Sequence, residues 1–201
     1  MARIVQENKG EKMEIEGTLR TEKKTKTLDL IYIAIGAAII TVCSWISIPM
    51  TVPFTLQTFA VFATLLILGG YRGTVATVVY VLMGAIGLPV FAGFSGGLAI
   101  ILGNTGGYIL GFIFIGLIYA TSIRLFGEKI YVELSALLTG LVVCYAFGTA
   151  WFMHVYMRNT GTVGLMTVLS WCVFPFVIPD LLKMALAFAV SRRVRSIIRQ
   201  D

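Results

Sequence analysis

Charged residues are scarce in this sequence, and long parts of it have none. Only 13% of the 201 residues are charged and 58% are hydrophobic, whereas about a quarter of a soluble domain is charged. No Asp, Glu, Lys or Arg occurs in four stretches, 30–71, 73–123, 134–157 and 159–179. About 20 apolar residues are enough for one helix to cross a bilayer. The sequence therefore excludes a soluble enzyme and predicts an all-α integral membrane protein.

Signals for catalysis, redox chemistry and nucleotide binding are also missing. Cys43, Cys144 and Cys172 lie in apolar segments without CxxC spacing, which indicates neither a disulfide framework nor a metal site. The sequence has no GxxxxGK[ST] pattern, so energy for active transport would have to come from a partner or an ion gradient. With no nucleophile–base pair in sight, we expect neither an enzyme nor a bound cofactor. Residues 1–27 hold five Glu among Lys and Arg, which argues against a cleavable signal peptide.

Proline and glycine divide the apolar stretches into six predicted spans. They cover about 28–48, 54–68, 74–91, 106–126, 131–157 and 163–191. Six crossings place both termini on one side of the membrane. Of the 16 Lys and Arg residues, 14 lie on that side, Arg158 lies on the other, and Lys183 is within a span. The positive-inside rule then predicts that both termini are cytoplasmic.

The charge distribution also predicts the domain organisation. Residues 1–27 form a polar cytoplasmic tail, 28–195 a six-helix membrane domain, and 196–201 a basic cytoplasmic tail. The net charge of +6 sits mainly at the two ends of the chain. We therefore interpret it as a signal for orientation and for contact with anionic membrane lipid, and not for nucleic acid.

Asp180 and Lys183 are the acid and base placed deepest in a predicted span. Three residues apart, they share one helical face, and each costs at least about 2.5 kcal/mol to insert. One interpretation is an ion pair that only locks the sixth span. The other is a polar ligand site in the outer half of the membrane, where Asp180 accepts hydrogen bonds from ligand N–H groups. Pro179 favours the second, because it is expected to begin a helical segment with free amide groups.

Other polar residues are predicted at the same outer level. Thr55 and Thr58 at the start of the second span are explained by helix capping, whereas the buried amide of Gln57 needs several partners and suits a ligand. Asn104 and Thr105 begin the fourth span and are either caps or ligand contacts. His154 has no second metal-ligating residue at the right spacing, so we interpret it as structural. Aromatic residues near this interface form a belt or line a cavity, namely Trp45, Phe54, Phe91, Phe94, Tyr108 and Trp151.

Small residues leave two further interpretations open. Gly103, Gly107 and Gly111 recur every four residues, which favours close helix packing. The glycine-rich segment 92–105 also allows an outer loop to fold back over a cavity. Ala34 and Ala38 form a small-residue face on the first span, which packs either within the bundle or against another chain.

Six ordered blocks in this sequence resemble signature segments of the BioY family. They are Pro53-Phe54-Thr55-Leu56-Gln57-Thr58-Phe59, Gly70-Tyr71-Arg72-Gly73, Gly84-Ala85-Ile86-Gly87-Leu88-Pro89-Val90-Phe91, Gly96-Gly97-Leu98, Thr105-Gly106-Gly107-Tyr108 and Pro179-Asp180-Leu181-Leu182-Lys183. The resemblance covers about residues 28–195. BioY proteins are the biotin-binding S components of energy-coupling-factor (ECF) vitamin transporters.

This resemblance implies an ECF S-component fold in a bacterial cell membrane and high-affinity capture of biotin from outside. It implies three partner subunits, a transmembrane coupling subunit and two cytoplasmic ATPases, with Ala34 and Ala38 docking on the coupling subunit. Asp180 matches the family's acid at the ureido group of biotin, and Lys183 matches its neighbouring base. The other biotin-binding residues predicted are Gln57, Ser95, Asn104, Tyr108, Phe54 and Phe91.

The sequence departs from the family pattern at two of these positions. The family often has Pro where this chain has Asn104, and it has an Asn near the position of Ser95. No Arg is available in the outer loop or the upper fourth span for the valerate carboxylate, so Lys183 or backbone N–H groups would have to bind it. Rival functions are an S component for another vitamin and a stand-alone facilitator or ion-coupled carrier.

Overall fold

The computed structural model describes residues 26–198, with side chains to residue 196, and is almost entirely helical. An N-terminal helix, Lys26–Trp45, precedes all the labelled elements. In chain order these are β1 (Ser47–Ile48), β2 (Phe54–Thr55), α2 (Gln57–Leu68), α3 (Gly70–Ala85), η1 (Ala92–Phe94), α4 (Leu98–Leu102), α5 (Gly106–Phe126), α6 (Ile130–Asn159), α7 (Leu165–Cys172) and α8 (Phe174–Ile198). Residues 1–25 and 199–201 of the predicted tails lie outside the described residues.

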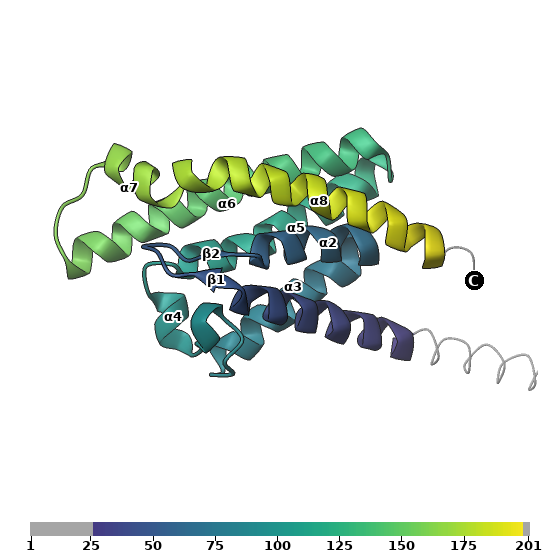
Figure 1. Cartoon of the computed structure of the whole chain (residues 1–201), viewed down its shortest axis with the longest axis horizontal. Helices are drawn as coiled ribbons and strands as arrows, with labels where there is room; N and C mark the ends of the chain where they lie inside the picture. Colours follow the sequence, from purple (N-terminus) through teal and green to yellow (C-terminus); the bar gives the residue numbers. More distant parts are fainter. Residues whose placement is uncertain (1–25, 199–201) are drawn as a thin grey trace, which may run out of the picture.

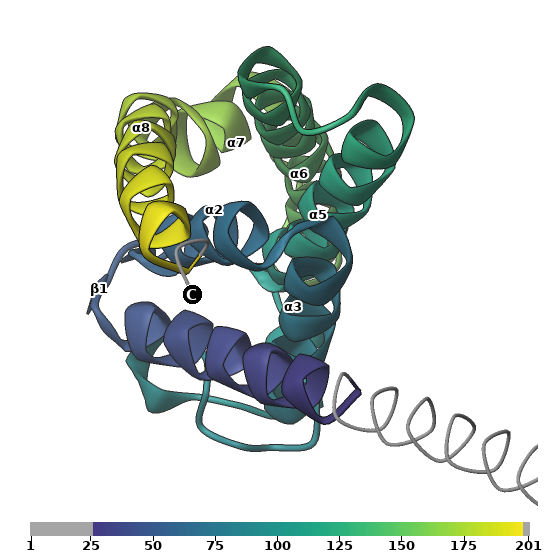
Figure 2. The same ribbon diagram turned by 90° about the vertical axis from the view of Figure 1, so that its right-hand side faces the viewer.

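The helices run back and forth along one long axis, and both ends of the described chain lie at the same end of the bundle (Figure 1). Within residues 26–198, four segments are long and apolar enough to cross a membrane: Lys26–Trp45, Gly106–Phe126, Ile130–Asn159 and Leu165–Ser196. The second and third predicted spans contain α2 and α3, which have only 12 and 16 residues. Seen end-on, α2 lies inside a ring of the other helices (Figure 2). A helix covered by protein in this way need not match the bilayer thickness.

Several boundaries differ from those predicted, and α3 begins at Gly70, four residues before the start of the predicted third span. Phe54 and Thr55 form β2, which pairs antiparallel with β1, instead of opening the second helix. The two prolines between these strands, Pro49 and Pro53, cannot continue a helix and favour a turn. The helix of the third span ends at Ala85, because Gly87 takes a positive φ of 101° and Pro89 follows.

A further difference concerns Pro179, which lies inside α8 and does not begin a helical segment. The break in the sixth span is at Val173, between α7 and α8. Pro175 occupies the first turn of α8, where its missing N–H has no intrahelical partner to lose. Pro179 removes one backbone hydrogen bond further on, which a helix packed among neighbours tolerates. The free amide groups expected at Asp180 are therefore not present. At the other end, α8 continues past residue 195, the predicted limit of the membrane domain.

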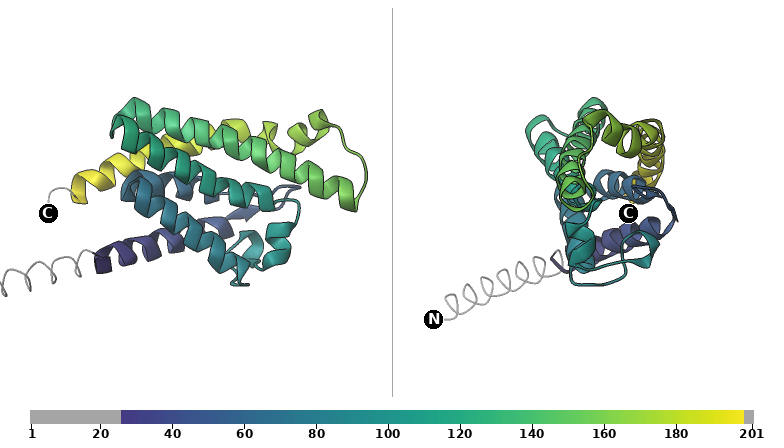
Figure 3. Two further views of the ribbon diagram at one scale, coloured as in Figure 1. Left: turned by 180° about the vertical axis from the view of Figure 1, so that it is seen from behind. Right: turned by 90° about the vertical axis from the view of Figure 1, so that its left-hand side faces the viewer.

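Glycines let α5 and α6 pack closely along their lengths, as predicted for Gly107 and Gly111; Figure 3 shows the two helices side by side from behind. Gly103 lies before α5, and a Cβ there would meet the backbone of α4 instead. A Cβ on Gly107 would lie 2.3 Å from Trp151, and one on Gly111 would lie 2.6 Å from Sγ of Cys144. The glycine-rich loop between α3 and α5 also folds inward, as its composition allowed. Gly93 and Gly97 both take positive φ there.

Replacing Gly111 with Ala should destabilise the protein. The added methyl group would overlap the side chain of Cys144, and overpacking costs roughly 1–3 kcal/mol. We expect the midpoint temperature of thermal unfolding in detergent to fall by several degrees. Loss of the monodisperse peak in size-exclusion chromatography measures this midpoint. Leu117→Ala is the control, because Leu117 is exposed on the same helix. Equal stability of the Gly111 variant and the wild type would contradict close packing here.

Charged side chains tie the helices together at the end of the bundle that holds the chain ends. Glu133 of α6 is 4% exposed and accepts a 2.7 Å hydrogen bond from Arg195 of α8 and a 3.3 Å bond from the Tyr119 hydroxyl of α5. Arg72 of α3 forms a 2.6 Å ion pair with Asp29 of the N-terminal helix. These contacts connect both terminal helices to the centre of the bundle.

Candidate functional site

A cavity of about 200 Å³ lies in the half of the bundle opposite the chain ends. Its wall comes from the segment before α2, the first turn of α2, the loop before α4, and helices α4 to α8. Apolar and aromatic side chains form most of this wall, including Val52, Phe91, Ile100, Ile109, Phe112, Leu141 and Phe176. Its polar side chains are Thr55, Gln57, Thr58, Ser95, Thr105, Tyr108, Tyr145, Asp180 and Lys183. Such a wall, apolar with a few converging polar groups, is typical of a small-molecule site.

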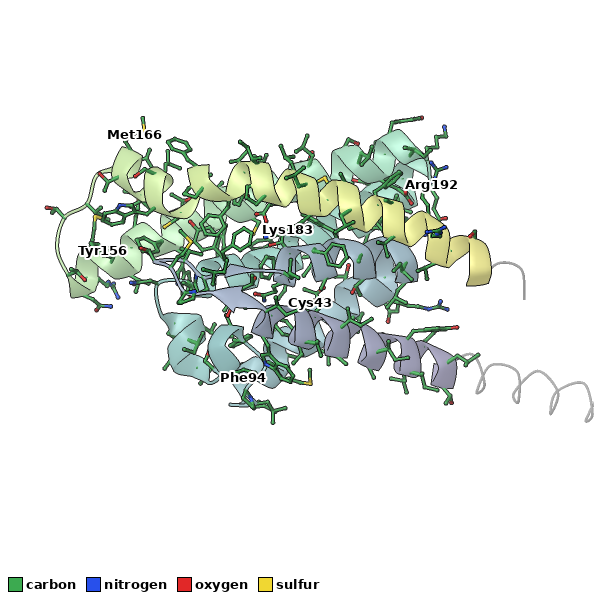
Figure 4. The ribbon with its side chains drawn as sticks, in the orientation of Figure 1. Cys43, Phe94, Tyr156, Met166, Lys183 and Arg192 are labelled. Carbon is green, nitrogen blue, oxygen red and sulfur yellow. The ribbon has the colours of Figure 1, made fainter. Side chains whose placement is uncertain are left out.

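Asp180 and Lys183 form the charged part of the cavity. Their side chains are almost fully buried, and Nζ of Lys183 donates to Oδ1 of Asp180 at 2.9 Å. Figure 4 shows Lys183 between α8 and α2. The structure contains the ion pair that the first interpretation predicted, and it places both residues in the wall of a cavity. The ligand site of the second interpretation stays a prediction. A buried charge that lost its partner here would be strongly destabilising.

The sequence analysis missed Tyr145, whose hydroxyl donates a 2.6 Å hydrogen bond to Oδ2 of Asp180. Each carboxylate oxygen of Asp180 thus has one protein donor, and each retains capacity for a second hydrogen bond. Lys183 uses one of its three N–H donors for Asp180 and has its ammonium 4.1 Å from the centre of the Phe54 ring. A tyrosine hydroxyl in the middle of a span needs a partner, and that requirement was the available signal for Tyr145.

The neutral polar residues are held by the protein while facing the cavity. Nε2 of Gln57 donates to the Tyr80 hydroxyl at 2.8 Å, and its amide oxygen accepts no hydrogen bond from the described residues. The hydroxyl groups of Tyr108 and Thr149 are 3.1 Å apart. Ser95 donates to the carbonyl of Ala92 at 2.8 Å, which stabilises the loop that brings Phe91 to the cavity.

Six of the eight predicted binding residues line the cavity, and two do not. Those that do are Asp180, Lys183, Gln57, Ser95, Tyr108 and Phe91. Phe54 lies directly behind the wall, where its ring contacts Lys183 and stacks on Phe176 at 6.1 Å. Asn104 lies in the turn between α4 and α5, and its neighbour Thr105 reaches the cavity instead.

Comparison with known proteins gives the chain its family. The model of the BioY family matches residues 18–200. The chain belongs to the BioY family. It is 40% identical to the biotin transporter BioY of Thermotoga maritima, over 84% of this chain and 96% of that protein. It is 37% identical to the probable biotin transporter BioY of Pyrococcus horikoshii, over 85% of this chain and 98% of that protein.

A solved structure agrees with this membership of the BioY family. The fold matches the crystal structure of the S-component for biotin from an ECF-type ABC transporter with a TM-score of 0.74. The two sequences are 26% identical, and the match covers 86% of this chain and 93% of the other. The S-component fold predicted from the BioY signature blocks is therefore confirmed.

Proposed function

We propose that this chain is the substrate-binding membrane subunit for biotin uptake, working within an ECF transporter and having no catalytic activity of its own. The observation that carries the proposal is the buried Asp180–Lys183 pair in the wall of the cavity. The chain that carries this pair belongs to the BioY family, and its relatives in that family are named as biotin transporters.

The polar groups of the cavity match those of biotin. The ureido ring of biotin has two N–H donors and one carbonyl, which suit the carboxylate of Asp180 and an amide or ammonium donor. The thiophane ring and the alkyl chain suit apolar walls such as Phe91 and Phe176. Lys183 has donors to spare for the valerate carboxylate or the ureido carbonyl.

Tyr145→Phe should weaken biotin binding while leaving the protein folded. The change removes the hydrogen bond that orients Asp180, and hydrogen bonds to charged groups contribute about 1.5–3 kcal/mol. We expect the dissociation constant for biotin to rise roughly 10- to 100-fold by calorimetry. Tyr156→Phe is the matched control, because Tyr156 is on the same helix outside the cavity wall. Unchanged affinity in the Tyr145 variant would remove this residue from the site.

Six crossings with both termini in the cytoplasm are part of the proposal. The ends of the described chain lie together in Figure 1, and most basic residues of the helix ends and turns belong to that same end of the bundle. Arg72, Arg124, Lys129 and Arg193 lie at that end of the bundle by their places in α3, α5, the turn after it and α8, and Arg158 lies at the other. The cavity then lies in the outer half of the membrane and receives its ligand from outside.

Docking of the coupling subunit on Ala34 and Ala38 is also supported by their position. Both are exposed on the N-terminal helix, while Gly36 and Ala37 face inward; a Cβ on Gly36 would lie 2.9 Å from Thr64. The small-residue face therefore points out of the bundle. Exposed small residues let another helix approach closely. The two ATPase subunits would act through this coupling subunit.

Calorimetry on the purified protein in detergent tests the proposal. We expect tight, roughly one-to-one binding of biotin that excess thiamine and riboflavin do not reduce. Binding of either competitor in place of biotin would favour an S component for another vitamin. ATP-independent uptake into liposomes that contain only this chain would favour a stand-alone carrier.

A further inference from the structure

A second hollow, of about 330 Å³, lies between α5 and α6 at the end opposite the biotin cavity. We call it the α5–α6 groove. From α5 come Ile118, Ser122 and Phe126, which are spaced by four residues and form one stripe. From α6 come Tyr131, Ser135 and Thr139 with the same spacing, together with Val132 and Ala136, and Lys129 stands in the turn between the helices.

Two of the Ser and Thr hydroxyl groups in the groove have no hydrogen bond to any described part of the chain. Thr121, outside the groove, donates to the carbonyl of its own helix at Leu117, and Ser135 donates to the carbonyl of Val132. Ser122 and Thr139 make no such bond within residues 26–196. In a bilayer, where water does not reach, an unpaired hydroxyl costs free energy. A ligand with oxygen acceptors would satisfy both groups.

The positive charge at the mouth of the groove and the depth of its hydroxyl groups in the membrane indicate which kind of ligand fits it. Lys129 lies at the mouth of the groove with its ammonium 5.8 Å from the centre of the Tyr131 ring, and Arg124 is close by in sequence. At a rise of 1.5 Å per residue, Ser135 and Thr139 lie about 8 and 14 Å into α6. These two positions therefore extend from the lipid headgroup region into the adjoining part of the hydrocarbon core. Ile118, Phe126 and Val132 make the rest of the wall apolar.

We propose that the α5–α6 groove binds an anionic phospholipid of the cytoplasmic leaflet. Lys129 holds its phosphate, the hydroxyls of Ser122 and Thr139 donate to its ester oxygens, and an acyl chain extends past Ile118. A free phosphate ion would use Lys129 but leave the deeper hydroxyls and the apolar wall without partners. The proposal uses the orientation given under Proposed function, and it does not depend on the identity of the ligand in the other cavity.

Native mass spectrometry of the detergent-solubilised protein tests this site. Phosphatidylglycerol and phosphatidylcholine with the same acyl chains are titrated separately. We expect the wild type to bind phosphatidylglycerol at least about fivefold more tightly, in line with one basic residue near the anionic surface. The variant Lys129→Gln with Ser122→Ala and Thr139→Val should lose this preference. Arg193→Gln, which removes one exposed cation from α8 at the same end, should keep it.

Each other outcome counts against the groove. If the Arg193 variant lost the preference for phosphatidylglycerol to the same extent, the preference would come from general surface charge. If the triple variant kept the preference, the lipid would bind at another place on the protein. Displacement of the lipid by millimolar inorganic phosphate would indicate an anion site. Size-exclusion chromatography and the midpoint of thermal unfolding of the same samples show whether each variant is folded, and the single Lys129→Gln variant replaces the triple one if the latter does not fold. A failure here is thus distinguishable from a failure of the biotin assignment.

Discussion

Replacing Asp180 with Asn should nearly abolish biotin binding. The carboxylate is the acceptor best placed for the ureido N–H groups, and it also holds Lys183 and Tyr145 in place. Because one change affects all three groups, we expect the dissociation constant to rise at least about 100-fold, which corresponds to about 2.7 kcal/mol. Calorimetry on purified protein measures it. Affinity equal to that of the wild type would remove Asp180 from the binding site.

The same substitution leaves Lys183 as a buried charge without its acid. Breaking a buried ion pair on one side costs about 3–5 kcal/mol, whereas removing both charges is often neutral. We therefore expect Asp180→Asn to lower thermal stability and Asp180→Asn with Lys183→Met to restore it. Biotin binding should stay lost in the double variant. If the double variant recovered binding together with stability, the pair would have only a structural role.

Replacing both Ala34 and Ala38 with Leu should abolish ATP-driven uptake and leave biotin binding unchanged. Two large side chains on the exposed face of the N-terminal helix would prevent close approach of a coupling helix. They lie away from the cavity wall, so the dissociation constant for biotin should not change. The measurement is biotin uptake into cells that express the complete transporter, with calorimetry on the same variant.

A matched control for that variant exists on α6. Ala146 and Ala150 are also exposed and also four residues apart. Replacing both with Leu makes the same change in volume on another outward face, and it should leave uptake intact. Normal uptake by the Ala34 and Ala38 variant would place the docking surface elsewhere. Loss of uptake in both variants would point to a general effect on insertion into the membrane.

Much of the fold follows from sequence pattern, because a bilayer limits the choices. Charge-free stretches and glycine or proline breakers predicted six spans, and within the described residues four segments are long and apolar enough to cross a membrane. The count of six also predicted that the two termini lie on one side, and the ends of the described chain do lie together (Figure 1). The errors were local. Phe54 and Thr55 form a strand because pairing with Ser47 and Ile48 replaces the hydrogen bonds of a helix. Those partners lie further away along the chain than the partners within a helix do. Pro179 stays within α8 because packing against neighbouring helices outweighs its local preference.

The candidate site was predicted less completely than the fold. Asp180 and Lys183 stood out because ionisable groups deep in a span are rare and costly. Tyr145 did not, since a hydroxyl in a mostly apolar helix carries no direction in the sequence. Asn104 and Thr105 are adjacent, and only the turn before α5 decides that Thr105 faces the cavity. Glu133 was overlooked for a similar reason, as its partner Arg195 is 62 residues away.

By itself the sequence determined that this is a helical membrane protein of the BioY family with one deep acid–base pair. The bilayer core excludes water and charge, so a segment that crosses it must be apolar, and that composition can be read directly from the sequence. The tertiary structure decided which helix faces meet: it joined Tyr145 to Asp180, closed Phe91 and Ser95 over the cavity, and turned Ala34 and Ala38 outward. Those outcomes depend on side chains from helices far apart in the sequence, whose relative rotation is set by packing and not by any one segment.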